Sequence, residues 1–297
     1  MEYLLDHGIE IILWLQQASP ALDAPFNALT SLGGGYSIFL IFALVYWCID
    51  RSTGARLAVL FLASNWVNAS LKDIFAQPRP FQYDPRVIKL SGAGGGGMPS
   101  SHTQATVVFW GYLACAFSRK WLWVIAGGLM ILVPLSRMYL GVHFPTDLAG
   151  GYLVGAALLM VFVRAEDRAA QWFQEKSLTW QLAIAVIIPS FMAVISLGLS
   201  IYTVTAAITF MGLCVGLVLE QRFVRFDTKG TWAVRVARYL LGIIVIIALQ
   251  NGLEMAFSGL VPRMALRGAV SFIAVLWGSF GAPWVFVRLG MSARRDR

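Results

Sequence analysis

The residues best suited to chemistry in this 297-residue chain stand in three short segments. Lys72 and Arg79 belong to the first, which reads K-D-I-F-A-Q-P-R-P. The second, G-A-G-G-G-G-M-P-S-S-H, ends on two serines and a histidine. Arg137, His143 and Asp147 belong to the third, S-R-M-Y-L-G-V-H-F-P-T-D. Cations, imidazoles and a carboxylate grouped in this way suit the binding and transfer of a phosphoryl group.

The run of glycines from Gly94 to Gly97 predicts a cradle for an oxyanion. Glycine has no Cβ, so consecutive backbone amides can turn toward one ligand. Basic side chains with charge-assisted hydrogen bonds would complete the site. The expected phosphate ligands are Lys72, Arg79, Ser100, Ser101, Arg137 and the backbone of Gly97. No D-x-D, H-E-x-x-H or carboxylate cluster accompanies them, so we expect neither a metal nor another cofactor.

His143 and Asp147 are four residues apart, and Pro145 between them favours the start of a helix with Asp147 in its first turn. A carboxylate in that place can accept a hydrogen bond from one imidazole nitrogen and leave the other free to attack phosphorus. We therefore predict His143 as the nucleophile and Asp147 as its partner. His102 would protonate the departing oxygen and later activate water.

Composition indicates an integral membrane protein. The chain is 58% hydrophobic and 13% charged, with a mean hydropathy of +0.71, too apolar for a soluble domain. We predict an all-α fold, a polytopic transmembrane helix bundle. Cys48, Cys115 and Cys214 fall singly in apolar stretches, so we interpret them as small buried hydrophobic residues rather than as a disulfide or metal framework.

The apolar segments predict how the chain crosses the bilayer. Two short helices, near residues 3–17 and 23–31, are expected in the membrane interface. Nine segments near spanning length follow, at 34–50, 57–72, 103–118, 121–136, 147–164, 181–199, 200–219, 238–257 and 268–288. We predict interfacial N-terminal helices at 1–33, a five-span core with the motifs at 34–180, and additional C-terminal spans at 181–297. Glu254, in the eighth segment, is either functional or, near the outer end of its helix, hydrogen-bonded to a neighbouring helix or in contact with water.

Alternate crossing of the membrane divides the 23 lysines and arginines unequally. Seven fall on the side that bears the three motifs, and the other sixteen, Arg295 and Arg297 among them, fall on the opposite side. The positive-inside rule therefore places the motifs at the extracytoplasmic face. The net charge of +8 then reflects topology rather than a nucleic-acid partner. Compact loops and an acidic N-terminus unlike a cleaved signal peptide favour a bacterial inner membrane.

The three segments closely resemble the signature motifs of the type 2 phosphatidic acid phosphatase superfamily, which includes membrane lipid phosphate phosphatases and vanadium haloperoxidases. The matching patterns are K-x6-R-P at 72–80, P-S-S-H at 99–102 and S-R-x5-H-x3-D at 136–147. The resemblance covers about residues 34–164 and implies the same roles for the residues named above. The second motif of the family usually reads P-S-G-H. Here Ser101 replaces the glycine, which keeps the amide but narrows the pocket.

The resemblance implies hydrolysis of a phosphate monoester or diphosphate on a lipid. Phosphatidic acid, phosphatidylglycerol phosphate, a sphingoid-base phosphate and a polyprenyl diphosphate all fit the same cradle. Two alternatives stay open. The enzyme could pass the phosphoryl group to a lipid or sugar hydroxyl, or the protein could be a non-catalytic lipid carrier that keeps the head-group clamp. The expected partners are a lipid phosphate and membrane lipids, with no nucleic acid, and the sequence leaves the oligomeric state open.

Overall fold

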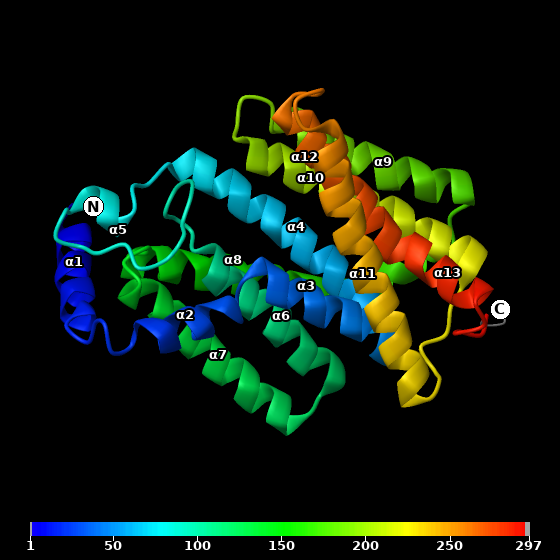
Figure 1. The fold of residues 1–297 in the computed structure, drawn as a ribbon, viewed down its shortest axis with the longest axis horizontal. Coiled ribbons are helices and arrows are strands. Elements are labelled where there is room, and N and C mark those ends of the chain that lie inside the picture. The colour runs from blue at the N-terminus through cyan, green and yellow to red at the C-terminus, as the bar shows by residue number, and fades with distance from the viewer. Residues whose placement is uncertain (1, 295–297) are drawn as a thin grey trace. The chain divides into compact units, whose positions relative to one another are not determined.

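The architecture is helical. A computed structural model describes residues 2–294, and within this range no β-strand occurs beyond two isolated bridge pairs (Figure 1). Arg295 and Arg297, assigned above to the cytoplasmic side, lie outside the described residues. The predicted all-α transmembrane bundle is confirmed in its class.

The helices before residue 175 carry the three motifs. They are α1 (Glu2–Gln16), α2 (Asp23–Ser31), α3 (Gly35–Leu44), α4 (Arg51–Phe75), α5 (Pro80–Tyr83), α6 (Ser101–Phe117), α7 (Lys120–Tyr139) and α8 (Pro145–Gln174). A π-helical turn, Val45–Ile49, extends α3. Motif residues therefore stand at helix ends and in the loops between helices.

Five further helices follow. They are α9 (Leu178–Ile195), α10 (Ile201–Leu219), α11 (Trp232–Phe257), α12 (Arg263–Leu276) and α13 (Ala282–Arg288). The π-helical turn Glu220–Val224 extends α10, and Trp277–Gly281 joins α12 to α13 without a break. Glu254 is exposed in the last turn of α11, and its role stays a prediction.

Six helical segments are long and apolar enough to cross a bilayer, so the protein is an integral membrane protein. These segments are Lys120–Tyr139, Pro145–Gln174, Leu178–Ile195, Ile201–Val224, Trp232–Phe257 and Arg263–Arg288. The predicted spans 34–50, 57–72 and 103–118 are also helical. They are not among the six because Ser37–Ile49 and α6 are too short and α4 is less apolar, with Arg56, Asn65 and Asn68 in its interior.

The chain forms two compact units. One comprises Met1–Ile38 and Val67–Arg164, and the other comprises Phe39–Trp66 and Ala165–Arg297. All three motifs belong to the first unit. The sequence predicts a division by function instead, at 1–33, 34–180 and 181–297, and this division stays a prediction.

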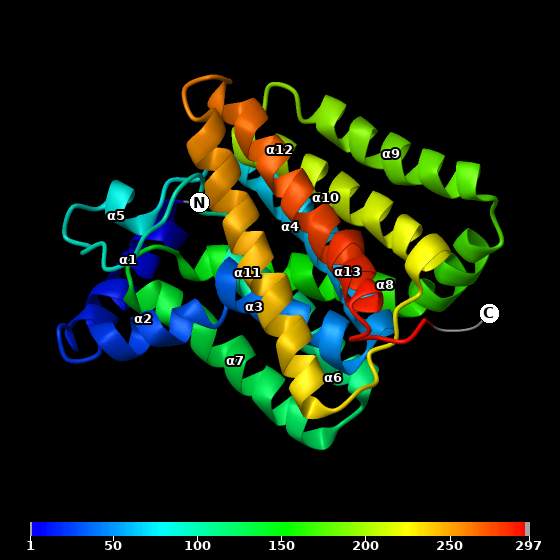
Figure 2. The same ribbon diagram turned by 45° about the vertical axis from the view of Figure 1, so that its right-hand side comes forward.

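The scaffold of the first unit is the hairpin of α6 and α7, which lie side by side in both views (Figure 1, Figure 2). A left-handed Ser118, with φ 49°, ends α6 and lets the chain reverse. Ala114, Leu122 and Ala126 form a buried contact between the two helices. Because the helices are antiparallel, the start of α6 and the end of α7 lie at the same end of the hairpin.

Small residues on α8 bring it close to α6. A Cβ on Gly151 would stand 2.8 Å from the carbonyl oxygen of Ser100, and one on Gly155 would stand 3.2 Å from that of Gln104. Only a residue without a side chain tolerates such an approach. The beginning of α8 is thereby held against the beginning of α6, where the second motif ends.

The N-terminal helices also belong to the first unit. α2 packs along α7, and α1 buries Leu5, Ile9 and Ile12 against Val87 and Phe144. Phe144 directly follows the predicted nucleophile in the chain. Residues 2–31 therefore cover the end of the hairpin where the motifs meet.

The second unit has its own core around α10, which lies beside α9 and α12 (Figure 2). Tyr46 and Trp47 are fully buried and donate to the carbonyl oxygens of Ser279 and Gly278 at 2.9 Å each. The buried Glu220 accepts a hydrogen bond from Arg51 Nε at 2.7 Å. These contacts give the C-terminal helices a packing interior independent of the motifs.

Candidate active site

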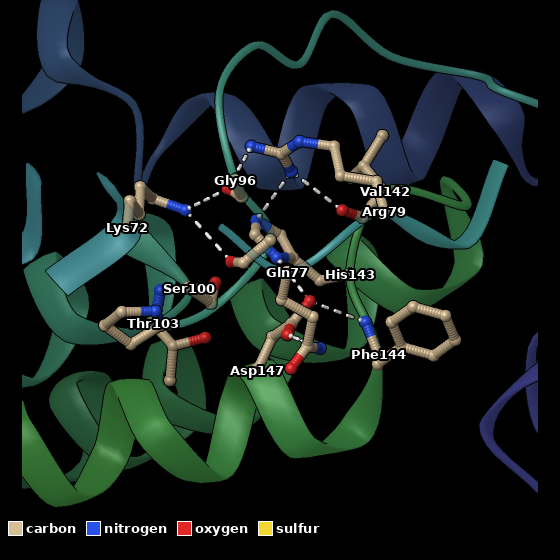
Figure 3. A network of polar contacts seen from close by, with 12 residues as sticks. Lys72, Gln77, Arg79, Gly96, Ser100, Thr103, Val142, His143, Phe144 and Asp147 are labelled. Atoms are coloured by element: carbon tan, nitrogen blue, oxygen red, sulfur yellow. Dashed lines mark hydrogen bonds and ion pairs between the residues drawn. The ribbon is translucent and has the colours of Figure 1, made fainter. Parts of the chain in front are cut away.

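The predicted nucleophile and its carboxylate partner form a buried pair. Helix α8 begins at Pro145, as the sequence predicts, and Asp147 stands in its first turn. His143 Nδ1 lies 3.0 Å from Asp147 Oδ2, and the backbone amide of Phe144 donates to the same oxygen at 2.9 Å (Figure 3). Both side chains are buried, with 1% and 0% of their surface exposed. The imidazole is therefore held at one nitrogen.

Arg79 determines the protonation state of the second imidazole nitrogen of His143, Nε2. Its Nη1 lies 3.2 Å from His143 Nε2 and also donates to the carbonyl oxygen of Val142 at 2.8 Å (Figure 3). A guanidinium can only donate, so Nε2 is the unprotonated nitrogen and Nδ1 carries the proton that faces Asp147. A nucleophilic imidazole requires this tautomer.

The glycine run contacts the cations through its carbonyl groups. Lys72 Nζ donates to the carbonyl oxygens of Gly96 and Gly97 at 2.8 and 2.9 Å, and Arg79 donates to those of residues 94–96 at 2.7–3.1 Å. The amide of Gly97 donates to the Gln77 carbonyl at 2.7 Å. In this structure the Gly97 amide therefore faces the Gln77 carbonyl, and its predicted place in an anion cradle stays a prediction. Buried cations need acceptors, and carbonyl groups flanked by no side chain can approach them closely.

The serines of the second motif sit at the start of α6. Ser100 is its N-cap, and the Oγ accepts from the amide of Thr103 at 3.4 Å. The Ser100 amide donates to the carbonyl oxygen of Asp147 at 2.9 Å, which joins the second motif to the third. Ser101 and His102 occupy the first turn of α6, directly after this junction.

Arg137 enters the site from the last turn of α7 and is 3% exposed. Its Nη1 donates to Thr30 Oγ1 at 2.8 Å, and its carbonyl accepts from the amide of Val142 at 3.2 Å. Within residues 2–294, the buried Nε of Arg137 has no hydrogen-bond partner. Thr30 was missed by sequence reasoning, and no pattern around it signals a role.

Gln77 was also missed. Its Nε2 donates to Asp147 Oδ1 at 2.7 Å, on the carboxylate oxygen that His143 leaves free (Figure 3). The residue stands at an unassigned position of the K-x6-R-P pattern, two residues before Arg79. Its location inside the first motif was the signal in the sequence that could have indicated a functional role.

Electrostatics favour a neutral imidazole. Burial, followed by the positive charges of Lys72, Arg79 and Arg137, lowers the pKa of His143 well below its usual range. Burial also lowers the pKa of Arg79, and the Asp147 carboxylate opposes that shift. In the part of the chain that the structure describes, no group of three or more His, Cys, Asp or Glu side chains could hold a metal ion. The positive charge near His143 comes from Lys72, Arg79 and Arg137.

A buried His-Asp pair that faces basic side chains, in a polytopic helical membrane protein, is the site that the three motifs predict. Comparison with protein families identifies the class. The PAP2 superfamily matches residues 53–171, and a second description, "PAP2 superfamily phosphatase, transmembrane extension", matches residues 204–295. The chain belongs to the PAP2 superfamily. This second match lies in the C-terminal spans, which contain none of the three motifs.

Individual relatives cover the chain in part. It is 22% identical to the glucose-6-phosphatase catalytic subunit 1 of Haplochromis nubilus, over 64% of this chain and 61% of that protein. It is 28% identical to phosphatidylglycerophosphatase B of Bacillus subtilis, over 53% and 81% respectively. Aquifex aeolicus LpxE, known from a crystal structure, superposes with a TM-score of 0.48 at 25% identity, over 52% of this chain and 93% of that one.

Proposed function

We propose that this protein is a membrane phosphatase that hydrolyses a phosphate monoester or diphosphate on a lipid through a phosphohistidine. One observation carries the proposal: His143 Nδ1 faces the Asp147 carboxylate, and His143 Nε2 faces the Arg79 guanidinium. A nucleophile and a phosphate-binding cation thus meet at one point. The name of the Bacillus subtilis relative, phosphatidylglycerophosphatase B, supports a lipid phosphate as the substrate class.

The chemistry divides into two displacements. In the first, His143 Nε2 attacks phosphorus, the bond from phosphorus to the lipid oxygen breaks, and His102 gives its proton to that oxygen. In the second, His102 takes a proton from water, the water oxygen attacks phosphorus, and the phosphorus-nitrogen bond breaks. The products are the lipid alcohol, or the lipid monophosphate from a diphosphate, and inorganic phosphate.

Binding of the phosphate requires an exchange of hydrogen bonds. Lys72 and Arg79 donate to carbonyl oxygens of the glycine run at 2.7–3.1 Å. Phosphate oxygens carry more negative charge than carbonyl oxygens and form shorter, stronger hydrogen bonds with cations. The substrate would therefore replace the carbonyl groups as the acceptor, with Arg137, Ser100 and the Ser101 amide as further ligands. Protein cations then neutralise the phosphoryl oxygens, so no metal is needed.

The proposal extends to location. We place the site at the extracytoplasmic face on the basis of the unequal distribution of basic residues, and the protein in a bacterial inner membrane on the basis of its compact loops. The lipid would enter sideways from the leaflet. This arrangement keeps the acyl chains in the bilayer while the head group reaches the motifs.

The test is a substrate panel on the purified protein in detergent, with and without a chelator. Phosphatidic acid, phosphatidylglycerol phosphate, a sphingoid-base phosphate and a polyprenyl diphosphate would each be assayed for phosphate release. We expect release from at least one lipid, unchanged by chelator and abolished in His143→Ala. Transfer of label to an added alcohol would favour the phosphotransferase, and lipid movement that survives His143→Ala would favour the carrier. Release that requires magnesium would contradict the metal-independent site.

A further inference from the structure

We infer that Gln77 is a positioning residue, which holds the Asp147 carboxylate in the orientation that fixes the tautomer of His143. The inference rests on the proposed function and extends it to a residue outside the predicted catalytic set. Gln77 donates its side-chain hydrogen bond to Asp147, and in the proposed mechanism it is not a ligand of the phosphoryl group. Its effect on the reaction would pass through Asp147.

The two oxygens of Asp147 are held by different donors. Oδ1 accepts from Gln77 Nε2 at 2.7 Å, while Oδ2 accepts from the Phe144 amide at 2.9 Å and faces His143 Nδ1 at 3.0 Å (Figure 3). A carboxylate can rotate about the bond that joins it to its Cβ. Donors on both oxygens restrict that rotation, so Oδ2 stays directed at His143 Nδ1.

The chain conformation aims Gln77 at this carboxylate. Helix α4 ends just before it, where Ala76 adopts a left-handed conformation with φ 46°. The carbonyl of Gln77 accepts from the Gly97 amide at 2.7 Å, so the backbone is fixed independently of the side chain. A substitution at this position removes the contact with Asp147 and leaves the backbone hydrogen bond in place.

The amide is well suited to this position. It donates to an ionised carboxylate without carrying a charge of its own, so it does not compete with His143 for the negative charge of Asp147. An acceptor in its place would repel the carboxylate oxygen. Gln77 thus favours the arrangement in which Nδ1 of the imidazole is protonated and Nε2 faces Arg79.

Gln77→Met is the direct test, because methionine approximates the length of glutamine and lacks the donor. We expect kcat for phosphate release to fall about 10- to 100-fold, the value of a hydrogen bond to a charged group, with KM little changed. The acidic limb of the pH profile of kcat should move to higher pH, since the carboxylate has lost a donor. Gln17→Met, at an exposed position of the same unit, is the matched control and should match the wild type.

A double-mutant cycle separates positioning from general stability. In an Asp147→Ala background, Gln77→Met should cause no further loss of kcat, because its route to the imidazole is gone. A second loss of the same size would overturn the inference, as would a kcat within about twofold of wild type in the single variant. Thermal unfolding of each variant confirms that the fold persists.

Nitrogen NMR of labelled histidine gives a readout that does not depend on turnover. In the wild type we expect His143 to carry its proton on Nδ1, and in Gln77→Met a mixture of the two tautomers. An unchanged tautomer in an active enzyme would refute the role of Gln77. A changed tautomer in a protein that releases no phosphate from any lipid would instead refute the proposed function and leave the positioning role standing.

Discussion

At the scale of single residues, the site is ordered by which atoms donate and which accept. His143 stands between a carboxylate that can only accept and a guanidinium that can only donate. The two partners assign one protonation state to each ring nitrogen. This arrangement could be predicted in part, because the spacing of His143 and Asp147 across Pro145 indicates the helix start that joins them.

Replacement of the Asp147 carboxylate tests whether His143 Nδ1 requires an acceptor. In Asp147→Asn the amide can present a donor to Nδ1, which favours the tautomer with the proton on Nε2. We expect kcat for phosphate release to fall by a factor on the order of 10³ to 10⁴, as it does where a buried carboxylate orients a catalytic histidine. Glu175→Gln makes the same chemical change at an exposed position and should leave kcat unchanged. Comparable activity in the two variants would exclude Asp147 from the mechanism.

The lowered pKa of His143 predicts its behaviour in acid. An ordinary histidine is half protonated near pH 6.5, at its usual pKa of about 6.5. Because burial and the nearby cations lower the pKa of His143, its neutral form should persist as the pH falls through that value. Titration of labelled histidine by NMR, with His143→Gln to assign the signal, measures this directly. A midpoint at or above the usual value would contradict the described electrostatics.

At the scale of elements, the glycine run is a loop whose positions differ in whether they have room for a Cβ. A Cβ on Gly97 would stand 2.9 Å from Asp147 Oδ2 and 3.2 Å from the carbonyl oxygen of Pro78, whereas a Cβ on Gly94 would have no neighbour within 4 Å. The four glycines look alike in the sequence, and only the packing shows which of them leaves no room for a Cβ. Consecutive glycines predict a close approach to a polar group and do not tell whether amides or carbonyls make it.

Alanine substitutions in this loop should therefore have unequal effects. Gly97→Ala should displace the Asp147 carboxylate and lower kcat at least about tenfold, since loss of one charged hydrogen bond already accounts for that factor. Gly94→Ala, the matched control, should stay near wild type. Phosphate release by the two purified variants gives the comparison, and equal effects would argue against a specific fit at Gly97.

The N-terminal helices are the second element with a direct contact to the site. Thr30 in α2 is buried and accepts from Arg137 Nη1 at 2.8 Å. The sequence predicts these helices as interfacial and gives no hint of this contact, because a single threonine carries no spacing pattern. The interaction depends on how α2 packs along α7, which is a tertiary feature.

Thr30→Val removes the hydroxyl and keeps the shape of the side chain. It leaves the buried Arg137 without this acceptor, at a cost of about 1–3 kcal/mol for an unsatisfied group. We expect a raised KM for the lipid phosphate, with Thr30→Ser close to wild type because it retains the hydroxyl. If the valine and serine variants have the same KM, the hydrogen bond to Arg137 contributes nothing to binding.

At the scale of the whole molecule, hydropathy predicted the membrane character, and the motifs predicted that His143 and Asp147 would meet. Three pieces of chain converge in one unit: the loop after α4, the start of α6, and the segment from the α7–α8 loop to the first turn of α8. The C-terminal spans could be predicted only as apolar helices. Contacts such as that of Arg51 with Glu220 have no signature in the spacing of residues.

The orientation in the membrane can be tested within the first unit. The loop with Lys89 belongs to the end that bears the site, and Arg119 stands at the opposite end of the α6–α7 hairpin, about 25 Å away along 17 residues of helix. After replacement of the native cysteines, Lys89→Cys should react with an impermeant maleimide in intact cells. Arg119→Cys should react only after the membrane is opened. The reverse pattern would place the site at the cytoplasmic face.

The central claim is that His143 becomes covalently phosphorylated during turnover. The most direct measurement is a single turnover with phosphate-labelled lipid, quenched in base, where phosphohistidine is stable, followed by peptide mapping. We expect label on the peptide that contains His143 in the wild type, label that can still be trapped in His102→Ala, and none in His143→Ala. Labelled phosphate released at the wild-type rate by His143→Ala, or label on a different residue, would contradict it.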